Sequence, residues 1–170
     1  CEGMAFGVDP KVVEDVTKAV RKVSDKPIIV KLSPNVTDIV EIAKAVEAGG
    51  GNGVSLINTL LGMAIDIHRR KPVLGNIYGG LSGPAVKPVA LRMVHQVYKG
   101  VTIPIIGLGG IMTGTDAIEF MMAGAQAVQV GTATMVDPTA ISRIAREMSE
   151  YVEQYNLNSI TDIVGAVHQA

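Results

Sequence analysis

The chain has 170 residues, and its 15 basic side chains are balanced by 16 acidic ones, so that the formal net charge is −1. This balance lacks the basic excess of a nucleic-acid-binding protein, and no apolar run approaches the roughly 18 residues that a membrane span requires. The length predicts a single domain over residues 1–170 with a core of its own. The single cysteine excludes an internal disulfide and favours a reducing compartment, for which we predict the cytoplasm.

Helical and strand patterns alternate along the sequence. Asp9-Pro10 supplies an N-cap and a first-turn proline for a helix over 10–24. Short β-branched runs without polar alternation are typical of strands that are buried on both faces. The next elements expected are strand 27–32, a helix capped by Asn35 or Thr37 that ends at glycines 49–51, strand 53–60, a helix over 84–99 and strand 103–106.

The remaining elements continue the same alternation. They are a helix from Thr113 or Thr115 to about residue 124, strand 127–130, a helix from Asp137-Pro138 to about residue 151, and a short C-terminal helix over 158–170. The last of these opens at Ser159 to Asp162, which have capping-box spacing. Residues 61–82 read as an irregular loop insertion. It contains the basic stretch His68 to Lys71, which would be either a solvated loop or part of an assembly surface.

Strands that alternate with helices predict an α/β fold with a parallel sheet. Two architectures fit, an open doubly wound sheet and a closed (β/α)8 barrel. A dinucleotide-binding open sheet should show G-x-G-x-x-G after a strand, but the run Gly107 to Met112 has methionine in place of the third glycine. Four βα units are too few to close an eight-stranded barrel. The pattern alone therefore leaves both architectures open.

Polar residues and glycines stand at the carboxyl end of every predicted strand. In parallel α/β folds this edge binds ligands. The glycines number 19, about 11% of the chain against a usual ~7%. Those that follow the third and fourth predicted strands lead into capped helices, which suggests a phosphate site. The alternative is that they only turn the chain. The strand-end residues are Lys31 and Ser33, Asn58 and Thr59, Gly107 to Gly110, and Gly131 with Thr132.

Four segments together resemble the dihydroorotate dehydrogenase family, and most of all its NAD-linked B-type catalytic subunit. They are Val30 to Ile39, Ile57 to Met63, Gly79 to Ala85 and Ile103 to Ile111, and the similarity runs from about Ala5 to the C-terminus. The resemblance implies the C-terminal half, about four βα units, of an FMN-binding (β/α)8 TIM barrel. It also implies oxidation of dihydroorotate to orotate in pyrimidine biosynthesis.

The resemblance also implies roles for individual residues. Lys31 would lie beside the flavin ring, Ile57 would touch the flavin, and Gly83 would approach FMN through its backbone. Asn58 and Thr59 would bind the substrate. The FMN phosphate would be held by Gly109, Gly110, Gly131 and Thr132. No metal site is expected.

The general base of this family is a cysteine in a Ser-Cys-Pro-Asn motif, which we expect upstream of Cys1. Cys1 is followed by Glu2-Gly3 and is not that residue. We therefore expect a cut or processed chain that has no catalytic residue of its own and does not turn over alone. The resemblance further implies a partner subunit with FAD and a [2Fe–2S] cluster that passes electrons to NAD, and a homodimer of catalytic subunits within a heterotetramer.

Two alternatives remain at this point. One is another FMN-dependent barrel, similar to dihydropyrimidine dehydrogenase, whose substrate pocket would differ in loops outside this chain. The other is a non-catalytic half-barrel that folds by pairing with a second chain or with itself, because four strands leave two open sheet edges and an apolar inner face.

Overall fold

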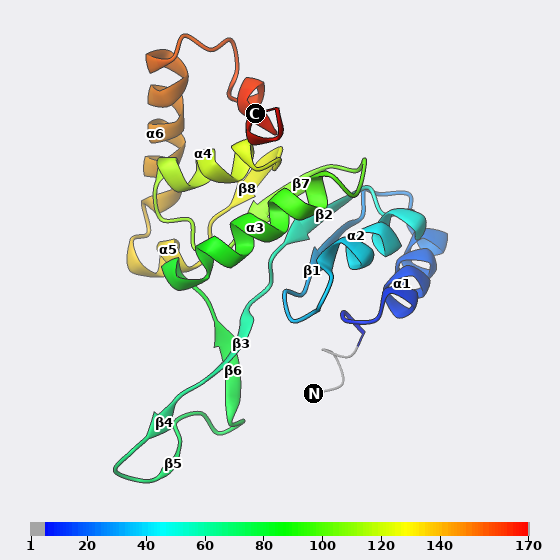
Figure 1. Cartoon of the computed structure of the whole chain (residues 1–170), viewed down its shortest axis with the longest axis vertical. Helices are drawn as coiled ribbons and strands as arrows, with labels where there is room; N and C mark the ends of the chain where they lie inside the picture. Colours follow the sequence, from blue (N-terminus) through cyan, green and yellow to red (C-terminus); the bar gives the residue numbers. More distant parts are fainter. Residues whose placement is uncertain (1–5, 170) are drawn as a thin grey trace.

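A computed structural model describes residues 6–169, and its centre is a parallel sheet of four strands (Figure 1). The strands are β1 (Ile29–Leu32), β2 (Gly53–Leu56), β7 (Ile105–Leu108) and β8 (Ala127–Gln129). They are neighbours in the order β1-β2-β7-β8, which is also their order in the sequence. Lys31 pairs with Ser55, Ser55 with Ile106, and Ile106 with Ala127. The predicted α/β fold with a parallel sheet is confirmed.

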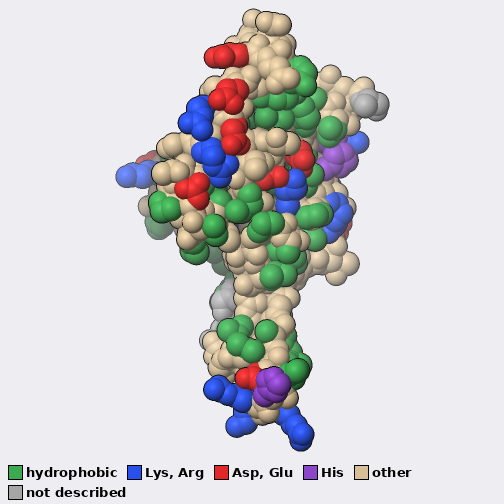
Figure 2. Space-filling model, turned by 90° about the vertical axis from the view of Figure 1, so that its left-hand side faces the viewer, with side chains coloured by type: hydrophobic (Ala, Val, Ile, Leu, Met, Phe, Trp, Pro, Cys, Tyr) green, Lys and Arg blue, Asp and Glu red, His purple; other side chains and the backbone are tan. Residues whose placement is uncertain are grey.

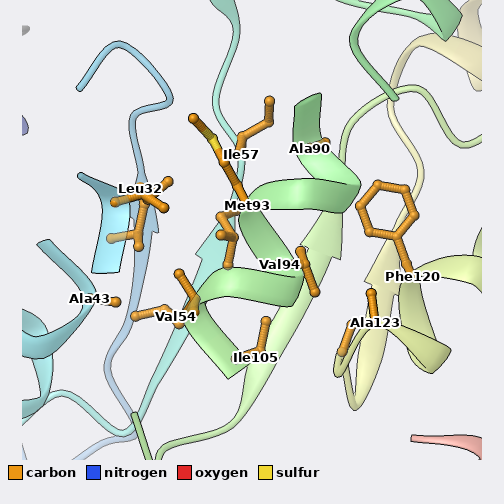
Figure 3. Packing of buried hydrophobic residues seen from close by; sticks show 14 of the residues in the cluster. Leu32, Ala43, Val54, Ile57, Ala90, Met93, Val94, Ile105, Phe120 and Ala123 are labelled. Atoms are coloured by element: carbon orange, nitrogen blue, oxygen red, sulfur yellow. The ribbon is translucent and has the colours of Figure 1, made fainter. Parts of the chain in front are cut away.

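Helices pack on one face of this sheet. Three helices each contact two neighbouring strands: α2 (Ile39–Ala48) contacts β1 and β2, α3 (Lys87–Tyr98) contacts β2 and β7, and α4 (Gly114–Met122) contacts β7 and β8. Helix α1 (Pro10–Val23) packs on α2. Figure 3 shows the core between α3 and the sheet, where Met93 and Val94 lie beside Val54 and Ile105. The burial of apolar side chains here is the main stabilising contribution to the fold.

The opposite face of the sheet is open on its outer strands. The register places Ile29 and Lys31 of β1 on this face together with Ala127 and Gln129 of β8. All four are exposed, and Ile29 keeps 53% of its surface accessible. The alternation along β1 therefore separates an open face from the buried face, to which Leu32 belongs.

The predicted N-caps of α1 and α4 are confirmed, whereas the predicted N-cap of α2 is wrong. Asp9 Oδ1 accepts hydrogen bonds from the backbone N–H groups of Lys11 and Val12 at the start of α1. Thr113 caps α4 in a reciprocal capping box with Asp116. The cap of α2, however, is Asp38, whose carboxylate accepts the Val40 N–H at 2.8 Å. Neither Asn35 nor Thr37 takes this role, and the side chain of Asn35 is bonded elsewhere.

Residues 60–81 form an arm with antiparallel strands, where the sequence predicts an irregular loop over 61–82. Strand β3 (Leu60–Met63) pairs antiparallel with β6 (Tyr78–Leu81), and β4 (Ile65–Asp66) pairs antiparallel with β5 (Lys71–Pro72). This arm, residues 60–81, projects away from the sheet (Figure 1). The glycines in β3 and β6 hid the strand pattern, since glycine has low strand propensity. The strand predicted over 53–60 accordingly ends at Leu56, and Leu60 belongs to the arm.

The surface of the arm is unusually apolar for an exposed segment. Figure 2 shows hydrophobic side chains along it and basic side chains at its tip. The basic tip contains Arg69, Arg70 and Lys71. Exposed large apolar residues of the arm are Leu61, Met63, Ile65, Ile67, Val73, Leu74, Ile77, Tyr78 and Leu81.

The helix predicted over 84–99 divides into two parts, and one helix that was not expected follows β8. The first part is a 3-10 turn, η2 (Pro84–Val86), and the second is α3. A short helix, α5 (Thr132–Val136), follows β8 and was not predicted. Helix α6 (Ala140–Gln154) then begins after Asp137-Pro138, because the Asp137 carboxylate accepts the Thr139 N–H and hydroxyl instead of capping the helix.

The predicted helix over 158–170 is wrong in type. The capping box of Ser159 and Asp162 is present, but it opens a 3-10 turn, η3 (Ile160–Ile163). A second 3-10 turn, η4 (Ala166–His168), follows Gly165, whose left-handed backbone (φ +73°) breaks the helical path.

None of the helices within residues 6–169 combines the length and apolar character that crossing a membrane requires. In the same range, no cluster of three or more His, Cys, Asp or Glu side chains could hold a metal ion. Cys1 lies outside the described residues.

Candidate functional site

A cavity of about 300 Å³ lies at the carboxyl ends of the parallel strands. All nine residues to which the sequence assigned a binding role line it. They are Lys31, Ile57, Asn58, Thr59, Gly83, Gly109, Gly110, Gly131 and Thr132. The structure thus brings together residues that are up to 101 positions apart in the sequence, although their roles toward a ligand remain predictions.

One wall of the cavity is built by the ends of β1 and β2. Lys31 is an exposed side chain on the open face of the sheet. Ile57 is buried, and its N–H donates to the Leu108 carbonyl at 2.9 Å. The peptide bond that joins Leu56 to Ile57 is cis. A flexible cation and an apolar side chain therefore both line this wall.

Asn58 and Thr59 follow directly and are both exposed to the cavity. The Asn58 N–H donates to the Leu32 carbonyl at 2.8 Å, so the sheet holds the backbone up to this residue. Beyond it the chain enters the arm. The two side chains supply a carboxamide and a hydroxyl, which can both donate and accept hydrogen bonds.

A second wall consists of backbone that approaches other backbone closely. Gly110 has φ +79°, and a Cβ atom there would lie 2.8 Å from the Gly83 carbonyl oxygen and 2.9 Å from the Lys87 nitrogen. Only glycine fits this position without a shift. The loop after β7 is therefore packed against the turn that carries Gly83.

Gly131 and Thr132 close the cavity at the end of β8. The Thr132 hydroxyl donates to Ser82 Oγ at 3.0 Å, which ties the start of α5 to the residue before Gly83. Space around Gly131 is open, since nothing lies within 4 Å of the position that a Cβ atom would take. The loop after β8 thus leaves free space beside Gly131 at this end of the cavity.

The family model described as dihydroorotate dehydrogenase matches residues 2–152 of this chain. The chain belongs to the dihydroorotate dehydrogenase family. The resemblance seen in the four sequence segments is therefore confirmed.

Curated relatives are similar to nearly all of this chain and carry the name dihydroorotate dehydrogenase B (NAD(+)), catalytic subunit. The protein of Alkaliphilus metalliredigens is 61% identical over 165 residues, which are 97% of this chain and 55% of the relative. That of Desulforamulus reducens is 62% identical over 166 residues, 98% of this chain and 55% of the relative. That of Geobacter sulfurreducens is 59% identical over 165 residues, with 97% and 54% covered. The chain spans about half the length of the curated relatives it matches.

An ion-pair network supports the glycine loop of this family member. Lys87 Nζ lies 2.6 Å from Asp116 Oδ1 and 2.8 Å from Glu119 Oε2. Burial raises the pKa of Asp116, but the hydrogen bonds from Lys87 and from the Met112 and Thr113 N–H groups outweigh it, and the net pKa is lowered. The carboxylate stays ionised and fixes the residues that follow Gly110.

Sequence reasoning assigned no binding role to seven further residues that line the cavity. Gln129 satisfies the same strand-end rule that selected the others, because it is the last residue of β8, and Ser82 lies beside Gly83. The apolar members carry no such signal in the sequence. The seven are Leu81, Ser82, Val86, Leu108, Ile111, Gln129 and Met135.

Proposed function

We propose that this chain forms the second half of an FMN-binding (β/α)8 barrel in a B-type dihydroorotate dehydrogenase catalytic subunit, which oxidises dihydroorotate to orotate. The observation that carries the proposal is the single cavity lined by all nine residues that the motifs selected. The fold supports it as well. The four strands follow one another in sequence order, whereas a doubly wound sheet reverses its order and carries helices on both faces.

The fit of FMN to the residues present rests on three features of the cavity. Backbone at Gly109 and Gly110 and the residues Gly131 and Thr132 offer N–H and hydroxyl groups to a phosphate. Ile57 offers an apolar contact for the ring, and Lys31 a cation near it. The volume of about 300 Å³ is at the small end for a cofactor pocket, as expected if residues outside this chain complete the site.

FMN, when bound, supplies the acceptor for the hydride that leaves C6 of dihydroorotate. Lys31 would stabilise the negative charge that develops on the cofactor. Asn58 and Thr59 would hold the substrate ring through hydrogen bonds, so that the C5 proton and the C6 hydride are both aligned with their acceptors. The proton at C5 would go to a cysteine base on a loop outside this chain.

A further part of the proposal concerns assembly. The relatives are named catalytic subunits, and we include a partner subunit with FAD and a [2Fe–2S] cluster, which passes electrons to NAD, and a homodimer of catalytic subunits. The apolar, basic-tipped arm supports this, since exposed apolar patches of this kind mark interaction sites.

The test joins this chain to its upstream half in one polypeptide and measures released FMN and orotate formation. We expect a yellow protein that forms orotate. Lys31→Ala should slow turnover at least tenfold while flavin stays bound. The control Lys26→Ala removes an exposed lysine before β1 and should leave turnover unchanged. A flavin-containing protein that forms no orotate but reduces another pyrimidine favours the dihydropyrimidine dehydrogenase-like reading. A colourless dimer favours the non-catalytic half-barrel.

A further inference from the structure

The segment that carries Asn58 and Thr59 lies between two differently oriented elements. Hydrogen bonds of the parallel sheet reach only to the Asn58 N–H. Strand β3 of the arm begins at Leu60 and leads away from the body (Figure 1). A junction of this kind needs an additional anchor if its side chains are to keep a fixed position in the cavity.

The side chain of Asn35 provides that anchor. Its Nδ2 donates to the Thr59 carbonyl at 3.1 Å, and its Oδ1 accepts the Leu61 N–H at 2.9 Å. In a parallel ladder, one residue bonds in the same way to the carbonyl before and the N–H after its partner. The carboxamide therefore takes the place of a backbone strand neighbour around Leu60.

Asn35 is itself held close to the end of β1. Its backbone N–H donates to Ser33 Oγ at 3.2 Å, and its Nδ2 lies 3.4 Å from the same oxygen. Pro34 between them is buried. Ser33 follows Leu32, whose carbonyl accepts the Asn58 N–H. The end of β1 thus holds the segment from both sides, through the backbone at Asn58 and through Asn35 beyond it.

We propose that Asn35 is a positioning residue, which fixes Asn58 and Thr59 for the ligand in the cavity without touching that ligand. The proposal rests on the proposed function for the identity of the ligand. A carboxamide is suited to this role because it offers a donor and an acceptor at once. A carboxylate would still accept the Leu61 N–H, but it would face the Thr59 carbonyl without a proton to donate.

The test uses the full-length protein with its flavin, and it compares Asn35→Ala, Asn35→Asp and the control Asn76→Ala. Asn76 is an exposed asparagine of the same arm, and within residues 6–169 its side chain makes no hydrogen bond. We expect both Asn35 variants to raise the KM for dihydroorotate about tenfold or more, since small displacements of positioning groups have effects of this size. Flavin content and the values for Asn76→Ala should not change.

Amide hydrogen exchange resolved to single residues gives a readout that is independent of activity. In Asn35→Ala, exchange at Leu61, whose N–H loses its acceptor, should accelerate about tenfold, while Ile57 keeps its protection. Faster exchange with an unchanged KM would show that Asn35 holds only the arm, and the positioning role would be wrong. Unchanged exchange would overturn it whatever the activity. If the wild-type protein forms no orotate while Asn35→Ala shows the expected change in exchange, the proposed function alone is refuted.

Discussion

Lys87 Nζ and Asp116 Oδ1 lie 2.6 Å apart and join the start of α3 to the first turn of α4. The side chains keep only 26% and 14% of their surface accessible, so water screens this pair less than the exposed pairs on α1 and α6. Asp116 also accepts the Met112 and Thr113 N–H groups at 2.9 Å each. One carboxylate thus connects two helices to the loop that carries Gly109 and Gly110.

Removal of this carboxylate should destabilise the protein and loosen the loop. Asp116→Ala leaves Lys87 without its closest partner and removes the acceptor of two backbone N–H groups. We expect the free energy of unfolding to fall by about 2 kcal/mol, the usual effect of losing hydrogen bonds to a charged group, and flavin to bind more weakly. Urea denaturation measures the first effect. Asp15→Ala removes an exposed carboxylate 3.7 Å from Lys11 and should change stability by less than about 0.5 kcal/mol; equal losses in both variants would contradict the proposed role.

Much of this site could be predicted because the ends of buried strands can be recognised from the sequence. Short apolar runs that end in Lys31, Asn58 and Gly109 located the carboxyl edge of a parallel sheet, and helix starts at Asp9 and Thr113 followed local capping rules. Such signals depend only on neighbours in the sequence.

Features that depend on distant partners could not be predicted in this way. Asn35 was a reasonable cap by residue type, but Thr59 and Leu61 bind its carboxamide, and Asp38 caps α2 instead. The arm is a second case. Glycines such as Gly62 and Gly79 have low strand propensity, so the sequence shows no strand pattern here. The two strands form because they pair with each other across the arm.

Gly110 gives a test of the close backbone contact beneath the cavity. Gly110→Ala would place a Cβ atom 2.8 Å from the Gly83 carbonyl oxygen in a backbone conformation that is strained for alanine. We expect at least tenfold weaker FMN binding, measured by fluorescence titration of the apoprotein. Gly75→Ala is the control, since no atom lies within 4 Å of its Cβ position, and it should bind FMN normally. Normal binding by Gly110→Ala would show that the loop adapts and that its tight packing is not needed.

The stacking of His95 in α3 on His168 in the last 3-10 turn predicts a pH dependence of stability. The ring centroids of His95 and His168 are 4.1 Å apart, and Tyr98 stacks on His168. Burial, and after it the charges of His168 and Lys99, lower the pKa of His95. The unfolded chain therefore binds a proton more readily near its ordinary pKa of about 6.5. The contribution of this group is complete above that pH and is lost as the pH falls below it.

We expect the free energy of unfolding to decrease between pH 7.5 and pH 5.5, and the decrease should be smaller in His95→Phe, which keeps a stacking ring without a titratable group. Urea denaturation at both pH values measures it. His68→Gln, on the exposed tip of the arm, should keep the wild-type dependence. If His95→Phe also keeps it, the dependence arises at other groups.

Thr59 packs over Gly80 of the neighbouring arm strand, and this contact predicts a selective effect on substrate binding. A Cβ atom at residue 80 would lie 2.7 Å from Thr59 Cβ and closer still to Thr59 Oγ1, so Gly80→Ala must displace that side chain. Gly62→Ala is a matched control in the same ladder, because its nearest contact would be Leu81 Cβ at an ordinary 3.5 Å. We expect Gly80→Ala to raise the KM for dihydroorotate about tenfold with flavin content unchanged, and Gly62→Ala to leave it within twofold. Because both substitutions remove one arm glycine, equal KM values would mean that the position of Thr59 does not control substrate binding.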